Sequence, residues 1–161
     1  MDNLTVRTGR PEDVHGVMRL ALAACADNGL TNPSPIKLLR EIWASLNLDH
    51  GIMGIVEEED IRAAALIRMD ALWYSDEKTL IERAIFVDPA YRAAKGGRAR
   101  LLCEWVKGLS KSLDLPLVIG VLSNERTEAK TRLYSRQFGA PAGTYFIYNG
   151  HTGLPDMKAA E

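Results

Sequence analysis

The sequence is poor in the residue types that mark several classes of protein. It contains 2 cysteines and 3 histidines among 161 residues, too few for a disulfide framework and without the spacing of a metal-ligand set. Cys25 and Cys103 both lie in apolar helical patterns, so we expect reduced core residues. The formal net charge is -1, which disfavours a protein whose main task is to grip nucleic acid, because that task needs a broad basic face. No metal site is predicted.

Long apolar runs are missing as well. No segment approaches the ~18 apolar residues of a membrane span, and the first residues lack the order of a secretion signal, a basic stretch followed by an apolar one. We therefore expect a cytoplasmic protein. The apolar fraction of 47% and the charged fraction of 25% are typical of globular chains. Without repeats or linkers, the chain is predicted to form one domain over residues 1–161, with an irregular tail at 150–161.

Apolar periodicity predicts alternating strands and helices. Strands are expected at residues 4–8, 51–57, 61–72, 80–87, 115–122 and 144–148, and helices at about 11–27, 35–46, 97–113 and 124–137. The polar residues 58–60 favour a hairpin between their flanking strands, and the strand–helix–strand unit around Gly97 should be parallel. The tryptophans, Trp43, Trp73 and Trp105, are expected in the core. The predicted fold is α/β (α+β): a mixed sheet of about six strands flanked by about four helices.

One predicted strand runs into a helix through a basic turn that contains glycine. The segment reads Val87-Asp88-Pro89-Ala90-Tyr91-Arg92-Ala93-Ala94-Lys95-Gly96-Gly97-Arg98-Ala99. Glycine lets the backbone approach a ligand, and the first N–H groups of a helix have no partner within it. The helix dipole favours an anion at the same place. The segment predicts a diphosphate site in which Arg92, Lys95 and Arg98 supply positive charge. A solvated basic turn is the alternative, with Gly96 and Gly97 as simple turn residues.

This segment and a second motif resemble the GNAT superfamily of acyl-CoA-dependent N-acyltransferases. There, a Val-x-Pro-x-Tyr-Arg-like segment precedes an Arg/Gln-x-x-Gly-x-Gly/Ala loop that holds the pyrophosphate of coenzyme A. Here Lys95 replaces the first glycine of the loop. The second motif reads Leu133-Tyr134-Ser135-Arg136-Gln137-Phe138-Gly139-Ala140, one residue longer than the common form. The resemblance extends over residues 4–148, and residues 125–134 are similar to phage- and prophage-encoded members.

The resemblance implies an N-acetyltransferase that uses acetyl-CoA and joins the acetyl group to an amine by direct attack. A covalent enzyme intermediate is not expected, because no cysteine falls in the expected cleft segment. Asn124 is implied as a cofactor-binding residue, and a helix cap is its alternative interpretation. The implied cofactor-binding residues are Ile85, Phe86, Val87, Arg92, Ala94, Lys95, Gly96, Gly97, Arg98, Ala99, Asn124 and Tyr134.

Two residues are candidates for proton transfer. Tyr134 is implied as the general acid, because a phenol keeps its proton at neutral pH and can give it to the leaving thiolate; a buried packing tyrosine is the alternative. Glu82 is the only carboxylate inside the strand predicted at 80–87 and is the candidate base. Neighbouring strand residues point to opposite faces, so Glu82 is also interpreted as a surface salt-bridge partner. Arg68 and Arg83 would then line the acceptor site and favour an anionic group on the amine.

The acceptor is expected to be an amine on a small molecule or a peptide, of unknown identity. Two other functions stay open. One is a CoA-binding module without turnover that acts as a sensor or interaction protein. The other is a toxin that acetylates aminoacyl-tRNA, which the near-neutral charge disfavours. Open sheet edges and an apolar last strand are compatible with a homodimer.

Overall fold

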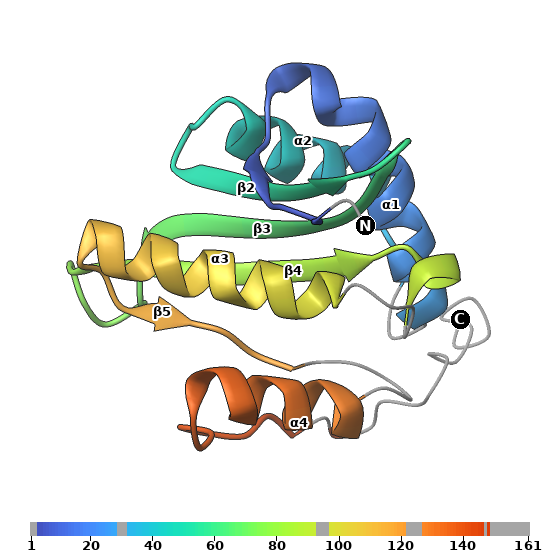
Figure 1. Ribbon diagram of the computed structural model, residues 1–161. Coiled ribbons are helices and arrows are strands. Elements are labelled where there is room, and N and C mark those ends of the chain that lie inside the picture. Colours follow the sequence, from blue (N-terminus) through green and yellow to red (C-terminus); the bar gives the residue numbers. More distant parts are fainter. Residues whose placement is uncertain (1–2, 29–31, 93–96, 122–126, 147, 149–161) are drawn as a thin grey trace, which may run out of the picture.

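A mixed sheet with helices on both faces forms the protein (Figure 1). The computed structural model describes residues 3–28, 32–92, 97–121, 127–146 and 148. The strands are β1 (Arg7–Thr8), β2 (Gly51–Glu57), β3 (Ile61–Ala71), β4 (Lys78–Val87) and β5 (Leu117–Val118). The helices are α1 (Val14–Asn28), α2 (Pro35–Leu46), α3 (Arg98–Leu113) and α4 (Thr127–Phe138). This arrangement confirms the predicted class of fold.

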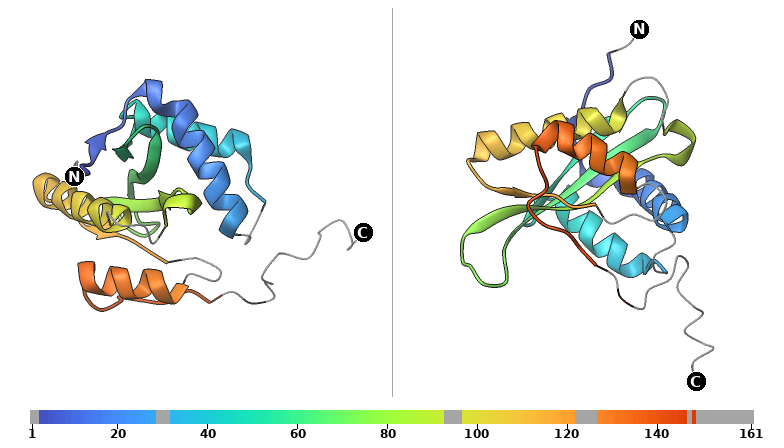
Figure 2. Two further views of the ribbon diagram at one scale, coloured as in Figure 1. Left: turned by 45° about the vertical axis from the view of Figure 1, so that its right-hand side comes forward. Right: turned by 90° about the horizontal axis from the view of Figure 1, so that it is seen from below.

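The strands lie in the order β1-β2-β3-β4-β5. β1 to β4 pair antiparallel, and the predicted hairpin joins β2 to β3. β4 and β5 pair in parallel, as expected for strands connected through a helix. Figures 1 and 2 show α4 beside β5, beyond the well-paired part of the sheet. The sheet is therefore regular on one side and open on the other.

Two apolar layers hold the helices on the sheet. Alternate strand residues face opposite sides, so Leu66 packs with α1 and α2 while its neighbour Ile67 packs with α3. On the first side, α1 and α2 contribute Val17, Leu20, Ala21, Ile42 and Leu46. On the second side, α3 contributes Leu102 and Val106. The helical spacing of these residues is the pattern that predicted the helices.

The ends of two helices follow local sequence signals. Pro35 is at the first position of α2, and the Ser34 hydroxyl caps the helix by accepting a hydrogen bond from the Lys37 N–H at 3.4 Å. Gly97 precedes α3 with φ of 60°, a left-handed conformation that glycine adopts without a steric penalty. These signals fix where each helix begins.

Three predicted strands are wrong in length or absent. The strand predicted at 4–8 is reduced to β1, and that predicted at 115–122 to β5. Residues 144–146 and 148 form no strand, and Tyr145 and Phe146 are exposed. A strand needs a hydrogen-bonding neighbour as well as an apolar sequence, and β5 leaves the sheet after two residues. The sheet has five strands in the described residues instead of about six.

The tryptophan prediction is wrong for two of three residues. Trp73 lies in the turn after β3 and is 95% exposed, and Trp43 on α2 is 49% exposed. Trp105 on α3 is half-buried over Gly54 of β2, where a Cβ atom would lie 2.6 Å from the indole. An apolar pattern does not say whether a second layer covers the residue.

In the parts of the chain that the structure describes, no helix combines the length and apolar character that crossing a membrane requires.

Candidate active site

β4 and β5 form a fork. They pair only at Leu80–Leu117 and Ile81–Val118, and the Leu80 N–H donates to the Pro116 carbonyl at 2.8 Å. Beyond this point the strands separate. From Glu82 onward, β4 therefore has no strand neighbour on this side among the described residues.

The register shows which backbone groups face the fork. The Asp88 N–H donates to the Arg62 carbonyl of β3 at 2.8 Å. Backbone groups alternate in direction along a strand, so those of Phe86 also face β3, whereas those of Ile85 and Val87 face the open side. The Val87 carbonyl accepts a hydrogen bond from Arg92 Nε at 3.3 Å, in agreement with this direction. Of the three residues predicted to bind through the backbone, Ile85 and Val87 are placed to do so.

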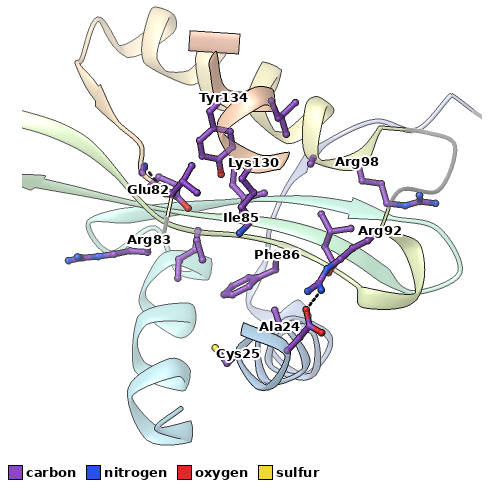
Figure 3. Close-up of a pocket in the computed structure, with 18 of the residues that line it drawn as sticks. Ala24, Cys25, Glu82, Arg83, Ile85, Phe86, Arg92, Arg98, Lys130 and Tyr134 are labelled. Carbon is purple, nitrogen blue, oxygen red and sulfur yellow. Dashed lines mark hydrogen bonds and ion pairs between the residues drawn. The ribbon is translucent and has the colours of Figure 1, made fainter. Parts of the chain in front are cut away.

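A cavity of about 1180 Å³ surrounds this open edge (Figure 3). Its walls come from α1, α2, β4, the start of α3, the residues after β5 and α4. The predicted site residues that line it are Glu82, Ile85, Phe86, Val87, Arg92, Gly97, Arg98, Ala99 and Tyr134. Ala94, Lys95, Gly96 and Asn124 lie outside the described residues. Segments far apart in the sequence thus meet around one cavity.

The start of α3 forms the basic end of the cavity. The Gly97 carbonyl accepts the Leu101 N–H at 2.9 Å, so the N–H groups of Arg98, Ala99 and Arg100 precede the first closed turn and have no partner within the helix. These groups carry the positive end of the helix dipole. The geometry suits an oxyanion such as a phosphate.

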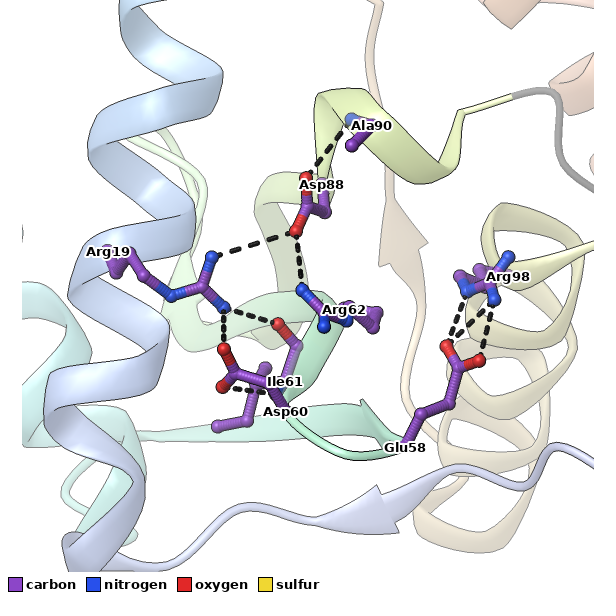
Figure 4. A network of polar contacts seen from close by, with 8 residues as sticks. All are labelled: Arg19, Glu58, Asp60, Ile61, Arg62, Asp88, Ala90 and Arg98. Carbon is purple, nitrogen blue, oxygen red and sulfur yellow. Dashed lines mark hydrogen bonds and ion pairs between the residues drawn. The ribbon is translucent and has the colours of Figure 1, made fainter.

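The Arg98 side chain is directed away from this anion position. Its Nε and Nη2 donate to the two carboxylate oxygens of Glu58, each at 2.8 Å (Figure 4). Its guanidinium lies 5.0 Å from the Tyr91 ring centroid. Only 6% of Arg98 is exposed. The side chain therefore anchors α3 to the turn between β2 and β3, and only its backbone N–H is placed for an anion.

Polar contacts also fix the connection between β4 and α3. Asp88 accepts the Ala90 N–H at 3.1 Å and Arg62 Nη1 at 3.2 Å, and Arg19 of α1 lies 3.6 Å away (Figure 4). Burial opposes the ionisation of Asp88, yet the bonds from Ala90 and Arg62 bring its pKa below the usual value. Arg62 also stacks on Tyr91 at 4.3 Å. The chain thus leaves β4 in a defined direction.

Arg92 bridges two elements beside the cavity. Its Nη1 forms an ion pair with Asp27 of α1, and its Nε binds the Val87 carbonyl. The side chain is only 15% exposed. Arg92 therefore places a cationic group between the end of β4 and α1, at the basic end that the sequence predicted.

A bulge in β4 decides which way its central side chains point. Leu66 faces Ala84 and Ile67 faces Glu82, so Arg83 is the extra residue. Glu82 is consequently on the side of α3 and α4, whereas Arg83 is on the side of α2, near Glu41 (Figure 3). The bulge is the physical reason that these neighbours serve different halves of the cavity.

Glu82 is a half-buried carboxylate rather than a surface salt-bridge partner. Its Oε2 accepts the Gly120 N–H at 3.4 Å. Burial raises the pKa of Glu82 to about 7, although the Gly120 bond and the charge of Lys130 lower it. At neutral pH the carboxyl group is thus poised between its two protonation states.

Tyr134 lies on the same side of β4. Its ring is buried edge-on against Phe138, with centroids 5.7 Å apart, and its hydroxyl points toward β4 (Figure 3). Burial and the nearby Glu82 and Cys103 raise the pKa of Tyr134 above its ordinary value. The phenol therefore holds its proton at neutral pH, as a general acid must.

The two cysteines differ in position. Cys103 is buried under the sheet as predicted, and burial, with the charge of Glu82, raises its pKa to about 12. Cys25 was predicted to be a core residue, but it is half-buried on α1 and lines the cavity. Burial raises the pKa of Cys25, which disfavours the nucleophilic thiolate.

Two residues of α2 in the cavity wall were not predicted from the sequence. Lys37 and Glu41 line the cavity beside Arg83. They are one helical turn apart and share a face, a signal that was available in the sequence. Arg68 was predicted to line the acceptor site; it is instead bound to the Asp49 carbonyl at 2.7 Å, behind Glu41.

Comparison with known proteins identifies the architecture. No protein-family model and no curated protein matches the sequence. Solved structures do match. One, of an aminoglycoside N-acetyltransferase in complex with CoA, has a TM-score of 0.67 and 15% identity, over 90% of this chain and 93% of that one. The chain has the GNAT fold.

Two further structures with this fold agree over similar lengths. A possible acetyltransferase from Clostridium difficile 630 has a TM-score of 0.66 and 16% identity, over 91% of this chain and 97% of that one. An aminoglycoside acetyltransferase from an uncultured soil metagenomic sample, in complex with sisomicin, has a TM-score of 0.66 and 14% identity, over 91% and 95%. Identities this low establish the GNAT fold alone. The similarity to phage-encoded members stays a prediction.

Proposed function

We propose that this protein is an N-acetyltransferase that takes its acetyl group from acetyl-CoA. The observation that carries the proposal is the open edge of β4, which meets in one cavity the first N–H groups of α3, those without a partner inside the helix. CoA combines amide groups with a diphosphate, and these surfaces are complementary to both. Two structures with the same fold support the choice of co-substrate: one contains CoA and another a CoA-linked bisubstrate analogue.

Backbone groups supply most of the proposed cofactor site. The N–H and C=O groups of Ile85 and Val87 face the fork, where they can pair with the amides of pantetheine. The N–H groups of Arg98 and Ala99 face the diphosphate, and the motif adds Lys95 and the glycines of the loop. Backbone recognition depends weakly on side-chain identity, which agrees with a loop that departs from the family motif at one position.

The reaction is a transfer between sulfur and nitrogen. The lone pair of the amine attacks the thioester carbon, and a C–N bond forms. A backbone N–H of β4 stabilises the resulting oxyanion. The C–S bond then breaks, and the CoA thiolate takes the proton of the Tyr134 hydroxyl. The amine nitrogen, which became positively charged when the C–N bond formed, loses one proton to a base, and Tyr134 regains its proton from solvent.

Glu82 is the proposed acceptor of that proton, through water. A pKa of about 7 leaves it partly ionised at neutral pH. Because Glu82 faces α4 and not α2, the proton would pass on the Tyr134 side of β4. Cys25 has no part in this scheme, since its thiol stays protonated and the attack is direct.

Calorimetry and a thiol-release assay test the proposal. CoA should bind with measurable heat, and acetyl-CoA with an acceptor amine should release thiol. Tyr134→Phe should lower kcat by about 100-fold or more, the usual contribution of a general acid, while CoA affinity is kept. Tyr74→Phe, at an exposed tyrosine, is the matched control. Absence of heat with CoA would overturn the proposal, and binding without thiol release from any amine would favour the CoA-binding module.

A further inference from the structure

The half of the cavity next to α2 carries an excess of positive charge. Lys37 and Arg83 line this half, and Arg68 lies behind it, while Glu41 supplies a carboxylate. The acceptor must enter on a side of β4 that the cofactor leaves free, and α2 forms the cavity wall on one such side. The charges of these four side chains therefore influence which amine the protein acetylates, an inference that rests on the proposed function.

Arg83 is an accessible and weakly paired cation. Its side chain is 49% exposed, and its sole ion pair among the described residues is with Glu41, at 3.9 Å. That distance is too long for a hydrogen bond. The bulge in β4 turns the residue toward α2. Its guanidinium thus presents a planar set of N–H donors without a close acceptor, the geometry that binds carboxylates in a bidentate manner.

Glu41 neutralises only part of this positive charge. One of its oxygens is buried between two guanidiniums, with Arg68 Nε at 3.7 Å and Arg83 Nε at 3.9 Å, and it accepts no hydrogen bond in the described structure. Arg68 is held in place by the Asp49 carbonyl and lies 3.4 Å from the Ser45 hydroxyl. A single carboxylate therefore faces two guanidiniums, of which Arg68 is held in place, and Lys37 is one turn away on α2.

The other acidic residues of the cavity do not offset the excess. Asp27 is paired with Arg92 at the basic end. Glu82 faces α3 and α4, on the far side of β4. Among the described residues that line the cavity, the α2 half therefore favours a bound anion.

We propose that the acceptor is an amine that also carries an anionic group, such as a carboxylate, bound by Arg83 and Lys37. The amino group then points along β4 to the thioester. A polycationic amine is disfavoured, because each added positive charge is repelled by these cations at short range. The protein would in this respect differ from the structural neighbour that was crystallised with sisomicin.

Matched pairs of amines test this inference by thiol release. Each pair contains an amino acid and its carboxamide, for example L-phenylalanine and L-phenylalaninamide, L-glutamate and L-glutamine, and glycine and glycinamide; sisomicin represents the polycations. For at least one pair, the member with the additional anionic group should have a kcat/KM at least tenfold higher than its amide. Equal rates within every pair, faster reaction of the amides, or acetylation of sisomicin alone would overturn the inference.

Variants connect the preference to Arg83. Arg83→Gln should remove most of the tenfold preference by slowing the anionic member, with little change for the amide. Arg40→Gln, at an exposed arginine of α2 that does not line the cavity, should keep the preference. Calorimetry with CoA on each variant separates the two proposals. Retained CoA heat with equal rates within the pairs refutes only the acceptor assignment, whereas loss of CoA heat in the unmodified protein refutes the proposed function.

Discussion

Glu82 is the residue whose environment departs most from what its sequence position indicates. It lies in a strand between Ile81 and Arg83, which favours an exposed, paired carboxylate. The bulge at Arg83 instead turns it toward α3 and α4, where burial raises its pKa to about 7. The protonated form is therefore the stable form in the folded protein at mildly acidic pH.

This shift makes protein stability depend on pH. The ordinary pKa of Glu82 is 4.5 and its pKa in the folded protein is about 7, so between these values the folded state holds a proton that the unfolded state has released. Its contribution to the free energy of unfolding is therefore present below about pH 4.5 and falls as the pH rises toward about 7, by at most about 1.4 kcal/mol per pH unit.

Urea unfolding across this range, with the unmodified protein and Glu82→Gln, is the measurement. The variant should lose less stability than the unmodified protein as the pH rises. Glu77→Gln, in an exposed turn, should leave the slope unchanged. Identical slopes for all three proteins would show that Glu82 titrates as an ordinary exposed carboxylate.

At the scale of elements, two glycines have opposite roles at α3, one before the helix and one inside it. Gly97 precedes the helix in a left-handed conformation, and a Cβ atom there would lie 3.3 Å from Arg100 Nε. Gly108 is exposed inside the helix, and a Cβ atom would meet nothing within 4 Å. The first glycine is required by backbone geometry, whereas the second only raises the conformational entropy lost on folding.

Alanine at these positions should therefore change stability in opposite directions. Gly97→Ala should lower the free energy of unfolding by about 1 kcal/mol, the strain of a left-handed alanine, and should weaken CoA binding by displacing the first N–H groups of α3. Gly108→Ala should raise the free energy of unfolding by about 0.5–1 kcal/mol without changing CoA affinity. Urea unfolding and calorimetry measure both effects. A stabilising Gly97→Ala would contradict the described start of α3.

At the scale of the whole molecule, the fork leaves the sheet incomplete. β4 and β5 share two residue pairs, and α4 packs beside β5 rather than over the paired strands (Figure 2). A ligand between the strands would connect the two parts through backbone hydrogen bonds. Cofactor binding should therefore stabilise the entire fold.

The expected size of this stabilisation follows from mass action. Acetyl-CoA at about 100 times its dissociation constant should add about 2.7 kcal/mol to the free energy of unfolding, which raises Tm by about 5–10 °C for a chain of this size. Thermal unfolding with and without acetyl-CoA measures the shift, and inorganic diphosphate at the same concentration is the control. A full shift with diphosphate alone would mean that the fork contributes nothing to binding.

Much of the fold could be predicted from local sequence. Ser34 and Pro35 determine the start of α2, and the polar residues 58–60 determine the turn between β2 and β3. Gly97 lies directly before α3 and Tyr134 lies on α4, in the elements where the sequence predicted them. These predictions succeeded because capping, turn formation and periodicity depend on residues near one another in the chain.

The tertiary structure decided the rest. The bulge at Arg83 directs Glu82 and Arg83 to different halves of the cavity. The Arg98 side chain, predicted to face a phosphate, instead pairs with Glu58 and anchors α3 to the turn between β2 and β3. The fork shortened β5, and α1 brought Cys25 to the cavity wall. Each outcome depends on contacts between segments distant in sequence. The sequence by itself therefore determined which elements and motifs form, whereas packing determined which side chains meet the ligand.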